Sequence, residues 1–243
     1  MKISYISDLH FDFYVDLKTG WEAQATVLLQ KLLPEDKGDV LIIAGDLSHF
    51  NEQSVFLLQF FSTHFAQILF VMGNHDYYVI GGEQHSAERA DDLQQQIKHL
   101  TNVTLLADFE VFMYEGVRFA GATNWYDLRK FAEQQFFLTM NDSKYITHFD
   151  IKIAHMIEQS RYADLQPVDV LITHVPTVRI FSHDYYGKST CYLNELPELK
   201  ATHYIFGHCH EQNVYEKYDC KFYINALGYP RQGLERSIKT FEL

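Results

Sequence analysis

Aspartate, histidine and asparagine side chains follow directly after several apolar segments of this 243-residue chain. The first pair is Asp8 and His10, which follow the apolar segment 2–6. Residues two apart in an extended segment point the same way, so this pair can grip one ion. Carboxylate, imidazole and amide oxygen are together the ligands of borderline or hard divalent ions such as Mn, Fe, Zn, Co or Ni. The same residue types follow four later apolar segments: Asp46, then Asn74 with His75 and Asp76, then His174, then His208 with His210.

The segments that precede these side chains have the pattern of buried strands. In the first half, strands are expected at 2–6, 40–44 and 68–72, and apolar residues at helical spacing lie between and after them. This strand–helix alternation predicts parallel strands with helical crossovers, whose carboxyl ends are the usual ligand edge of an α/β sheet. The expected helices span 21–33, 54–65 and 83–100.

After residue 103 the pattern changes to short strands that follow one another closely. One helix is expected at 151–163. Two sheets packed face to face with helices outside fit this order better than one open sheet. We therefore expect an α/β fold, a two-sheet sandwich of mixed strands flanked by helices, in a single domain over 1–243. The expected strands of this half are 103–106, 110–114, 117–120, 168–172, 203–206, 213–216 and 221–224.

Charge and composition restrict the partners. The formal net charge is -12, and no run of Lys or Arg offers the basic face that long nucleic acid requires. A small anionic substrate stays compatible, because bound cations reverse the local field. No apolar run approaches the length of a membrane span. The three cysteines are odd in number and lack a Cys-x-x-Cys pair, so a reducing, cytoplasmic location is expected.

Taken in order, the polar motifs resemble those of the calcineurin-like metallophosphoesterase family. The resemblance extends from residue 8 to residue 210, with Thr173 where the family often has Gly. The matching motifs are Asp8-Leu9-His10, Gly45-Asp46, Gly73-Asn74-His75-Asp76, Thr173-His174 and Gly207-His208-Cys209-His210.

The resemblance implies a centre of two divalent metal ions. Asp46 would bridge the ions, and His75 would protonate the leaving oxygen or stabilise the phosphate. Asp76 would be the acid beside His75, and capping of a turn is its alternative role. The first ion would be held by Asp8, His10, Asp46 and His210, and the second by Asp46, Asn74, His174 and His208.

Such a centre predicts hydrolysis of a phosphate ester or anhydride. Two cations about 3.5–4 Å apart clamp the attacking and leaving oxygens, and a metal-bridging hydroxide would attack phosphorus. The acidic charge and the aromatic content favour a small organic phosphate, either a phosphodiester or a nucleotide-like compound. The alternatives are a phosphomonoesterase or protein phosphatase, and a non-catalytic protein-binding module on the same fold. A nuclease would need a basic track that the sequence lacks.

Two further segments are candidates for substrate contacts. Trp125 and Tyr126 could stack on a base or ring, with core or surface packing as the alternative. Arg179 and Lys188, in the loop after His174, could hold a second phosphate, with a solvated loop charge as the alternative. Metal identity and oligomeric state stay open.

Overall fold

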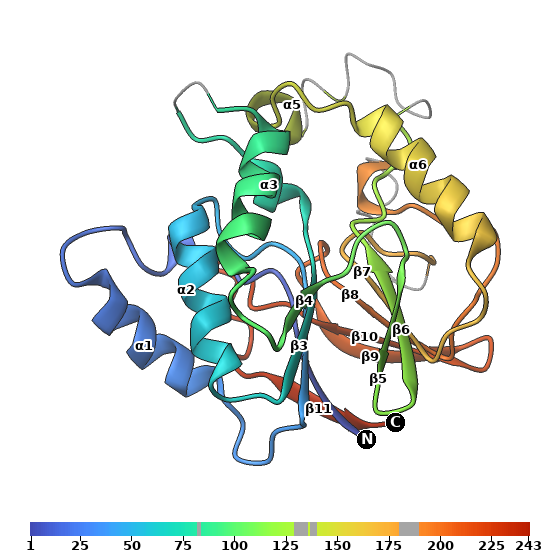
Figure 1. The fold of residues 1–243 in the computed structure, drawn as a ribbon, viewed down its shortest axis with the longest axis horizontal. Helices are drawn as coiled ribbons and strands as arrows, with labels where there is room; N and C mark the ends of the chain where they lie inside the picture. Colours follow the sequence, from blue (N-terminus) through green and yellow to red (C-terminus); the bar gives the residue numbers. More distant parts are fainter. Residues whose placement is uncertain (82–83, 129–135, 137–139, 180–189) are drawn as a thin grey trace.

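The computed structural model describes residues 1–81, 84–128, 136, 140–179 and 190–243. Two sheets pack face to face, and helices cover their outer faces (Figure 1). Apolar residues from both sheets fill the space between them, among them Ile42 and Val71 of the first and Phe119 and Ile172 of the second. This confirms the predicted two-sheet sandwich flanked by helices.

The first sheet has the strand order β11-β1-β2-β3-β4. Strands β1 to β4 are parallel, and β11 (Lys239–Glu242) pairs antiparallel with β1. The four parallel strands are β1 (Lys2–Ile6), β2 (Val40–Ala44), β3 (Gln67–Val71) and β4 (Val103–Leu105). Three helices cover the outer face of this sheet: α1 (Trp21–Leu32), α2 (Asn51–Ser62) and α3 (Ser86–Ile97).

The second sheet has the strand order β5-β6-β7-β8-β10-β9. Its outer face packs against α6 (Ile151–Asp164), whose Tyr162 lies in a cluster with Leu171 and Phe222. Asp150 caps α6 by accepting hydrogen bonds from the backbone N–H groups of Lys152 and Ile153. The strands are β5 (Val111–Tyr114), β6 (Val117–Ala122), β7 (Val170–Thr173), β8 (His203–Phe206), β9 (Gln212–Lys217) and β10 (Cys220–Asn225).

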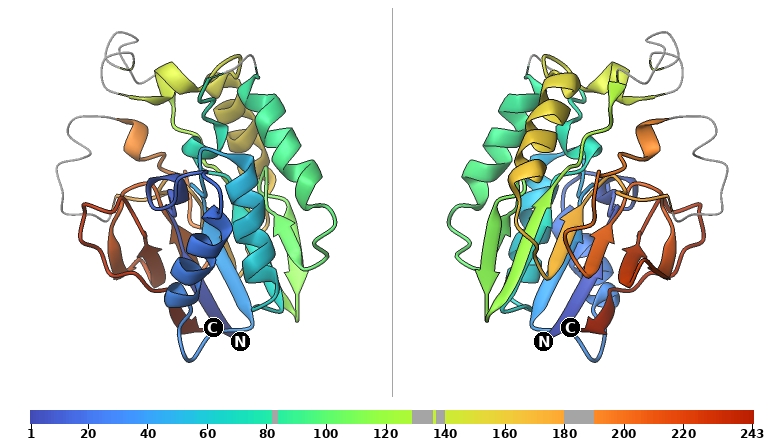
Figure 2. Two further views of the ribbon diagram at one scale, coloured as in Figure 1. Left: turned by 90° about the vertical axis from the view of Figure 1, so that its left-hand side faces the viewer. Right: turned by 90° about the vertical axis from the view of Figure 1, so that its right-hand side faces the viewer.

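The parallel strands of both sheets release their loops at one edge of the sandwich, opposite the edge where the two termini lie side by side (Figures 1 and 2). A bridge between Ser7 and Ala226 joins the ends of β1 and β10 across the two sheets. The short helices near this edge are η1 (Phe11–Phe13), η2 (Asn74–Tyr77), α5 (Asp142–Tyr145) and η4 (Thr190–Tyr192). In the described part of the chain, every helix is too short or too polar to cross a membrane.

Candidate metal centre

The proposed ligands sit on turns that hold the backbone in the left-handed region. The φ angles are 49° at Asp8, 40° at His10, 58° at Asp46, 68° at His208 and 46° at His210. A residue other than glycine rarely adopts this conformation, and it costs on the order of 1–3 kcal/mol unless the surroundings impose it. Five such residues on converging loops therefore indicate a site that the fold holds in place.

Two glycines let the carboxylates reach the centre. A Cβ atom at Gly73 would overlap the Oδ1 atom of Asp46, and one at Gly207 would lie 2.6 Å from the Oδ2 atom of Asp8. Only a residue without a side chain fits at either position. The glycines of the two motifs therefore serve the close approach of backbone to ligand.

Three ligand atoms form a nearly equilateral triangle at one side of the centre. The Asn74 Oδ1 atom lies 3.0 Å from His174 Nε2 and 3.1 Å from His208 Nδ1, and the two nitrogens are 3.2 Å apart. Atoms bound at about 2.1 Å to a single ion are separated by about 3.0–3.4 Å. The triangle thus has the dimensions of one face of a coordination shell.

Each histidine of the triangle has an inner ring nitrogen, which belongs to the triangle, and an outer one, which faces away from it. The hydrogen bonds of the outer nitrogens show whether the inner nitrogens carry a proton or a lone pair. His174 Nδ1 lies 2.9 Å from the Ala44 carbonyl oxygen, and His208 Nε2 lies 3.1 Å from the Cys191 carbonyl oxygen. A carbonyl oxygen only accepts, so both outer nitrogens donate, and in the neutral rings the inner nitrogens present lone pairs. Lone pairs facing one another at this distance repel unless a metal ion, or a proton on one of the rings, lies between them. The arrangement is also that of metal-bound histidines, which usually donate their second N–H to a carbonyl or carboxylate.

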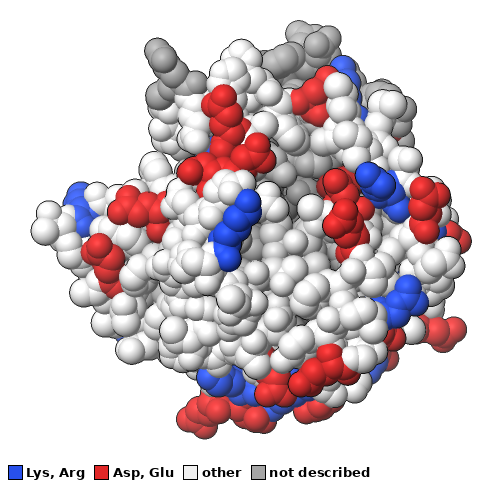
Figure 3. Space-filling view, viewed as in Figure 1, with Lys and Arg blue, Asp and Glu red and all other residues white. Residues whose placement is uncertain are grey.

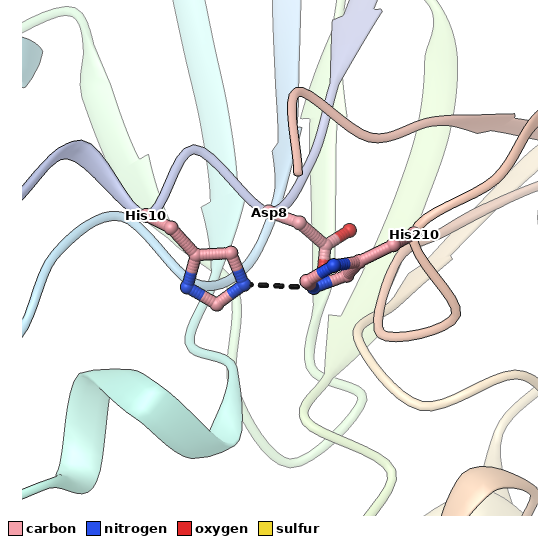
Figure 4. A group of neighbouring side chains, drawn as sticks. All are labelled: Asp8, His10 and His210. Atoms are coloured by element: carbon pink, nitrogen blue, oxygen red, sulfur yellow. Dashed lines mark hydrogen bonds and ion pairs between the residues drawn. The ribbon is translucent and has the colours of Figure 1, made fainter. Parts of the chain in front are cut away.

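A second group of ligand atoms faces the first. His10 Nε2 and His210 Nε2 are 2.8 Å apart, and His210 Nε2 lies 3.6 Å from Asp8 Oδ1 (Figure 4). His210 Nδ1 lies 2.8 Å from Gln232 Oε1, which directs its Nε2 lone pair into the group. His10 Nδ1 is buried and has no hydrogen-bond partner among the described residues. A divalent ion between these atoms would bind His10, His210 and Asp8 together.

Asp46 connects the two groups. Its Oδ2 atom lies 3.5 Å from His10 Nε2 and 3.4 Å from His174 Nε2. Its Oδ1 atom accepts a hydrogen bond of 2.9 Å from the backbone N–H of His75. The structure therefore brings all seven predicted ligands together, and the donor set fits two divalent ions that share one carboxylate.

The electrostatics of the centre favour positive charge at its middle. Burial acts to raise the pKa of Asp46, but the charges of His174 and His75 outweigh it, and the pKa lies well below the usual range. Burial opposes protonation of His174, yet Asp46 raises the pKa of that ring to about 9. For His10 and His208, burial lowers the pKa well below the ordinary value. Asp46, His10 and His208 are therefore in the charge state that metal binding requires, whereas the proton on His174 occupies the place of an ion and must leave when one binds.

His75 lies at the end of a chain of hydrogen-bonded groups. Asp12 Oδ2 lies 2.9 Å from His49 Nδ1, and His49 Nε2 lies 2.7 Å from His75 Nδ1. Burial acts to raise the pKa of Asp12, but its bonds to His49 prevail and lower it, so this end is anionic. Burial lowers the pKa of His75 to about 4 in the metal-free protein. A proton added anywhere in the chain therefore appears as an N–H at His75 Nε2, the nitrogen not engaged by His49.

Asp76 has the turn-capping role that was the alternative to an acid beside His75. Its carboxylate accepts backbone N–H bonds of 2.8 Å from Asp46, 2.9 Å from Leu47 and 2.8 Å from Gly73. Burial first, and then the charge of Asp46, raise the pKa of Asp76 to about 6. The buried Arg89 donates to the Asp76 carbonyl and ties this turn to α3. Asp76 thus fixes the two metal-ligand loops to each other.

A cleft with a volume of about 230 Å³ opens over the centre. Three tyrosines, Tyr78, Tyr192 and Tyr229, contribute to its wall, and Tyr229 stacks on His10 with ring centroids 4.6 Å apart. None of its lining residues in the described ranges is Lys or Arg. The other residues that line it are Asp46, Asn74, His75, Met140, Asn141, Asp142, His208, Cys209, His210 and Gln232.

Three of the four predicted substrate contacts lie outside the lining of this cleft. Trp125 and Tyr126 are only 2% and 1% exposed and pack in one interior cluster, so stacking of either ring on a substrate is not supported. Core packing, the alternative for both, is what the structure has. Arg179 is exposed, and its carbonyl oxygen accepts from Lys217 on β9, away from the cleft lining. Lys188 lies outside the described residues.

Several residues of the site were not identified by the sequence patterns. Asp12 stands two positions after His10 in the printed sequence and reaches the site only because η1 turns the chain back toward His49. Asp142 and Gln232 come from segments without any ligand-like motif. Of these three residues, only Asp12 could have been suspected from the sequence, because it lies close to the first motif.

Comparisons with known proteins agree with this fold. A family model described as calcineurin-like phosphoesterase matches residues 1–212. An uncharacterized protein of Acanthamoeba polyphaga mimivirus is 24% identical over 270 residues, which is 95% of this chain and 92% of that protein. The solved phosphopantetheinyl hydrolase of Mycobacterium tuberculosis superposes with a TM-score of 0.68 at 18% identity, covering 95% of this chain and 90% of that one. At that identity the similarity is one of fold.

Proposed function

The chain belongs to the calcineurin-like phosphoesterase family and is a metal-dependent phosphoesterase, and we propose that it hydrolyses a small organic phosphodiester or nucleotide-like phosphate. We propose further that two divalent ions bind in the two groups of ligand atoms described above. The observation that carries the proposal is that two groups of ligand atoms converge on either side of one buried carboxylate, Asp46.

The proposed ligands divide between two subsites. Asp46 belongs to both, because its Oδ2 atom approaches one histidine of each group. Asp8, His10 and His210 complete the first subsite, and Asn74, His174 and His208 complete the second. When bound, two such ions supply Lewis acidity toward phosphoryl oxygens and lower the pKa of water.

We propose that His75, from the side of the cleft, protonates the leaving oxygen or stabilises the phosphate. Its Nδ1 atom is engaged by His49, so Nε2 is the ring nitrogen left for substrate. Burial lowers the pKa of His75 to about 4 although the anionic Asp12 stands at the end of the chain, so an anionic substrate beside the ring is needed to raise that pKa and hold a proton there at pH 7. A ring nitrogen of His75 also lies within 4.8 Å of ligand atoms of His10 and Asp46, close enough to reach the same substrate.

The lining of the cleft supports a phosphodiester over a monoester. A monoester dianion is usually held by the fork of an Arg side chain, and the described lining offers neither Arg nor Lys. The half-buried rings of Tyr192 and Tyr229 instead offer flat, partly apolar surfaces, which suit a base or another ring carried by the phosphate. A singly charged diester with a flat organic group fits both features.

Long nucleic acid is not expected as a substrate. On the face drawn in Figure 3, Lys and Arg side chains are scattered among acidic ones and form no continuous track. We also propose that 1–243 is a single domain, as the sequence suggested. A cytoplasmic location is supported by Cys191, Cys209 and Cys220, which are thiols rather than disulfides.

The test is a metal-reconstituted assay on matched substrates. We expect hydrolysis of an aryl phosphodiester and of nucleotide-like diesters at higher kcat/KM than of the aryl phosphomonoester. A preference for the monoester would contradict the proposed substrate class. If the protein binds two ions but hydrolyses none of these esters, that result would support the alternative function, a non-catalytic binding module.

A further inference from the structure

We propose that Asp142 is a positioning residue of the second ion subsite, where its carboxylate holds the Asn74 amide with the oxygen toward the ion. This inference rests on the ligand roles proposed above. Asp142 lies at the start of α5, 68 residues from Asn74, and is 1% exposed. No sequence motif indicated it.

Asp142 receives hydrogen bonds from three sides. The Asn74 Nδ2 atom donates to Asp142 Oδ1 at 2.8 Å, and the Tyr78 hydroxyl donates to the same oxygen at 2.5 Å. The Tyr126 hydroxyl donates to the other oxygen, Oδ2. Both oxygens of the carboxylate are therefore engaged, and its plane is fixed by two buried tyrosines.

The consequence for Asn74 follows from the chemistry of an amide. Its two ends have nearly the same shape, so packing alone does not decide which end faces the histidines. With the NH₂ end inward, it would donate to the lone pairs of His174 Nε2 and His208 Nδ1, which lie 3.0 and 3.1 Å away. That orientation would satisfy the histidines without any ion and place donors where the ion belongs.

The carboxylate of Asp142 opposes this flip. It accepts but does not donate, so a flipped amide would set its oxygen against another oxygen at the distance of a hydrogen bond. The Asn74 oxygen is therefore kept toward the subsite, and the histidine lone pairs are left for a cation. Tyr126, which the sequence suggested as a substrate contact, acts here through Asp142 instead.

The experiment measures ion binding rather than turnover alone. Metal-free protein is titrated with Co²⁺, and bound ions are counted by visible absorption and elemental analysis. For Asp142→Ala we expect the affinity for the second ion to fall about 10–100-fold, the usual effect of losing a residue that orients a metal ligand, with the first ion retained. Asp142→Asn can still present an oxygen to Asn74, so it is expected to recover most of the second-ion affinity.

Two companion variants separate positioning from general stability. Tyr126→Phe removes one donor to the carboxylate while the ring stays packed, and a smaller loss in the same direction is expected. Lys144→Ala changes an exposed residue of the same helix and is expected to bind both ions as the wild type does. If Asp142→Ala fails to fold, Tyr126→Phe carries the test.

The outcomes distinguish this inference from the proposed function. Wild-type affinity for the second ion in Asp142→Ala, or equal loss of both ions, would overturn the positioning role. Two ions in the wild type without phosphoester hydrolysis would overturn the proposed substrate and leave the positioning role intact. A wild type that binds a single ion would overturn the ligand assignment and the role of Asp142 with it.

Discussion

Replacing His75 with alanine is expected to lower turnover by roughly 10²–10⁴-fold, the range of general acid–base catalysis, while both ions stay bound. That range corresponds to about 2.7–5.5 kcal/mol in the barrier. The ion subsites should survive, because the contact of His75 with Asp46 is made by the backbone N–H, which alanine keeps. The ring itself bonds to His49, outside the triangle of Asn74, His174 and His208.

A second variant, with a smaller expected effect, tests whether the hydrogen-bonded chain behind His75 contributes to turnover. His49→Ala removes the partner of His75 Nδ1 but leaves the catalytic ring, so a loss of about tenfold is expected, equal to about 1.4 kcal/mol. Both variants are assayed at saturating metal with an aryl phosphodiester, and kcat is separated from KM. Bound ions are counted in the same samples.

Two results would refute this reasoning. Full activity of His75→Ala would remove the ring from catalysis. Loss of an ion in that variant would instead make His75 a metal ligand, which its closeness to His10 and Asp46 would then explain.

Three further predictions concern packing, proton linkage and the metals. Gly73→Ala would force a Cβ atom onto the Asp46 carboxylate, so we expect loss of both bound ions and a stability loss of about 1–3 kcal/mol, measured by metal content and denaturant unfolding. Burial raises the pKa of Glu158 from 4.5 to about 8, so its contribution to stability is full below pH 4.5 and is lost as pH rises toward 8. Urea unfolding at several pH values should show that Glu158→Gln flattens this slope by up to about 1.4 kcal/mol per pH unit, and an unchanged slope would contradict the shift. Chelation should lower the melting temperature of the wild type, because ions held between buried ligand atoms such as His174 Nε2 and His208 Nδ1 bind the folded protein and not the unfolded one, and calorimetry that shows no change would count against metal in the native protein.

The order of strands and the ligand positions were accessible from the sequence. Apolar segments such as 40–44 are buried on both faces, so they stand out without any tertiary information. The structure confirms the helix over 21–33 almost to the residue, since α1 spans Trp21–Leu32 and the helix ends before Pro34. The β11 strand was not predicted, because its alternation is short and its pairing partner, β1, lies at the opposite end of the chain.

The surroundings of the ligands were not accessible in the same way. Trp125 and Tyr126 are aromatic residues near a ligand segment, and only the fold shows that both rings point into the interior. Asp76 follows His75 directly, yet its carboxylate turns away to cap the backbone of Asp46. Asp142 reaches Asn74 across 68 residues, a contact that no local spacing encodes. Chemistry carried by a motif is visible in sequence, whereas the groups that orient it depend on tertiary packing.

The central claim is that phosphoester hydrolysis depends on two ions that share Asp46. The most direct measurement follows the rate of aryl phosphodiester hydrolysis while metal-free protein is titrated with Mn²⁺ and bound ions per chain are counted. We predict that hydrolysis rises only as the second ion binds, and that Asp46→Ala abolishes this rise. Full hydrolysis with one ion per chain, or without any ion, would contradict the account.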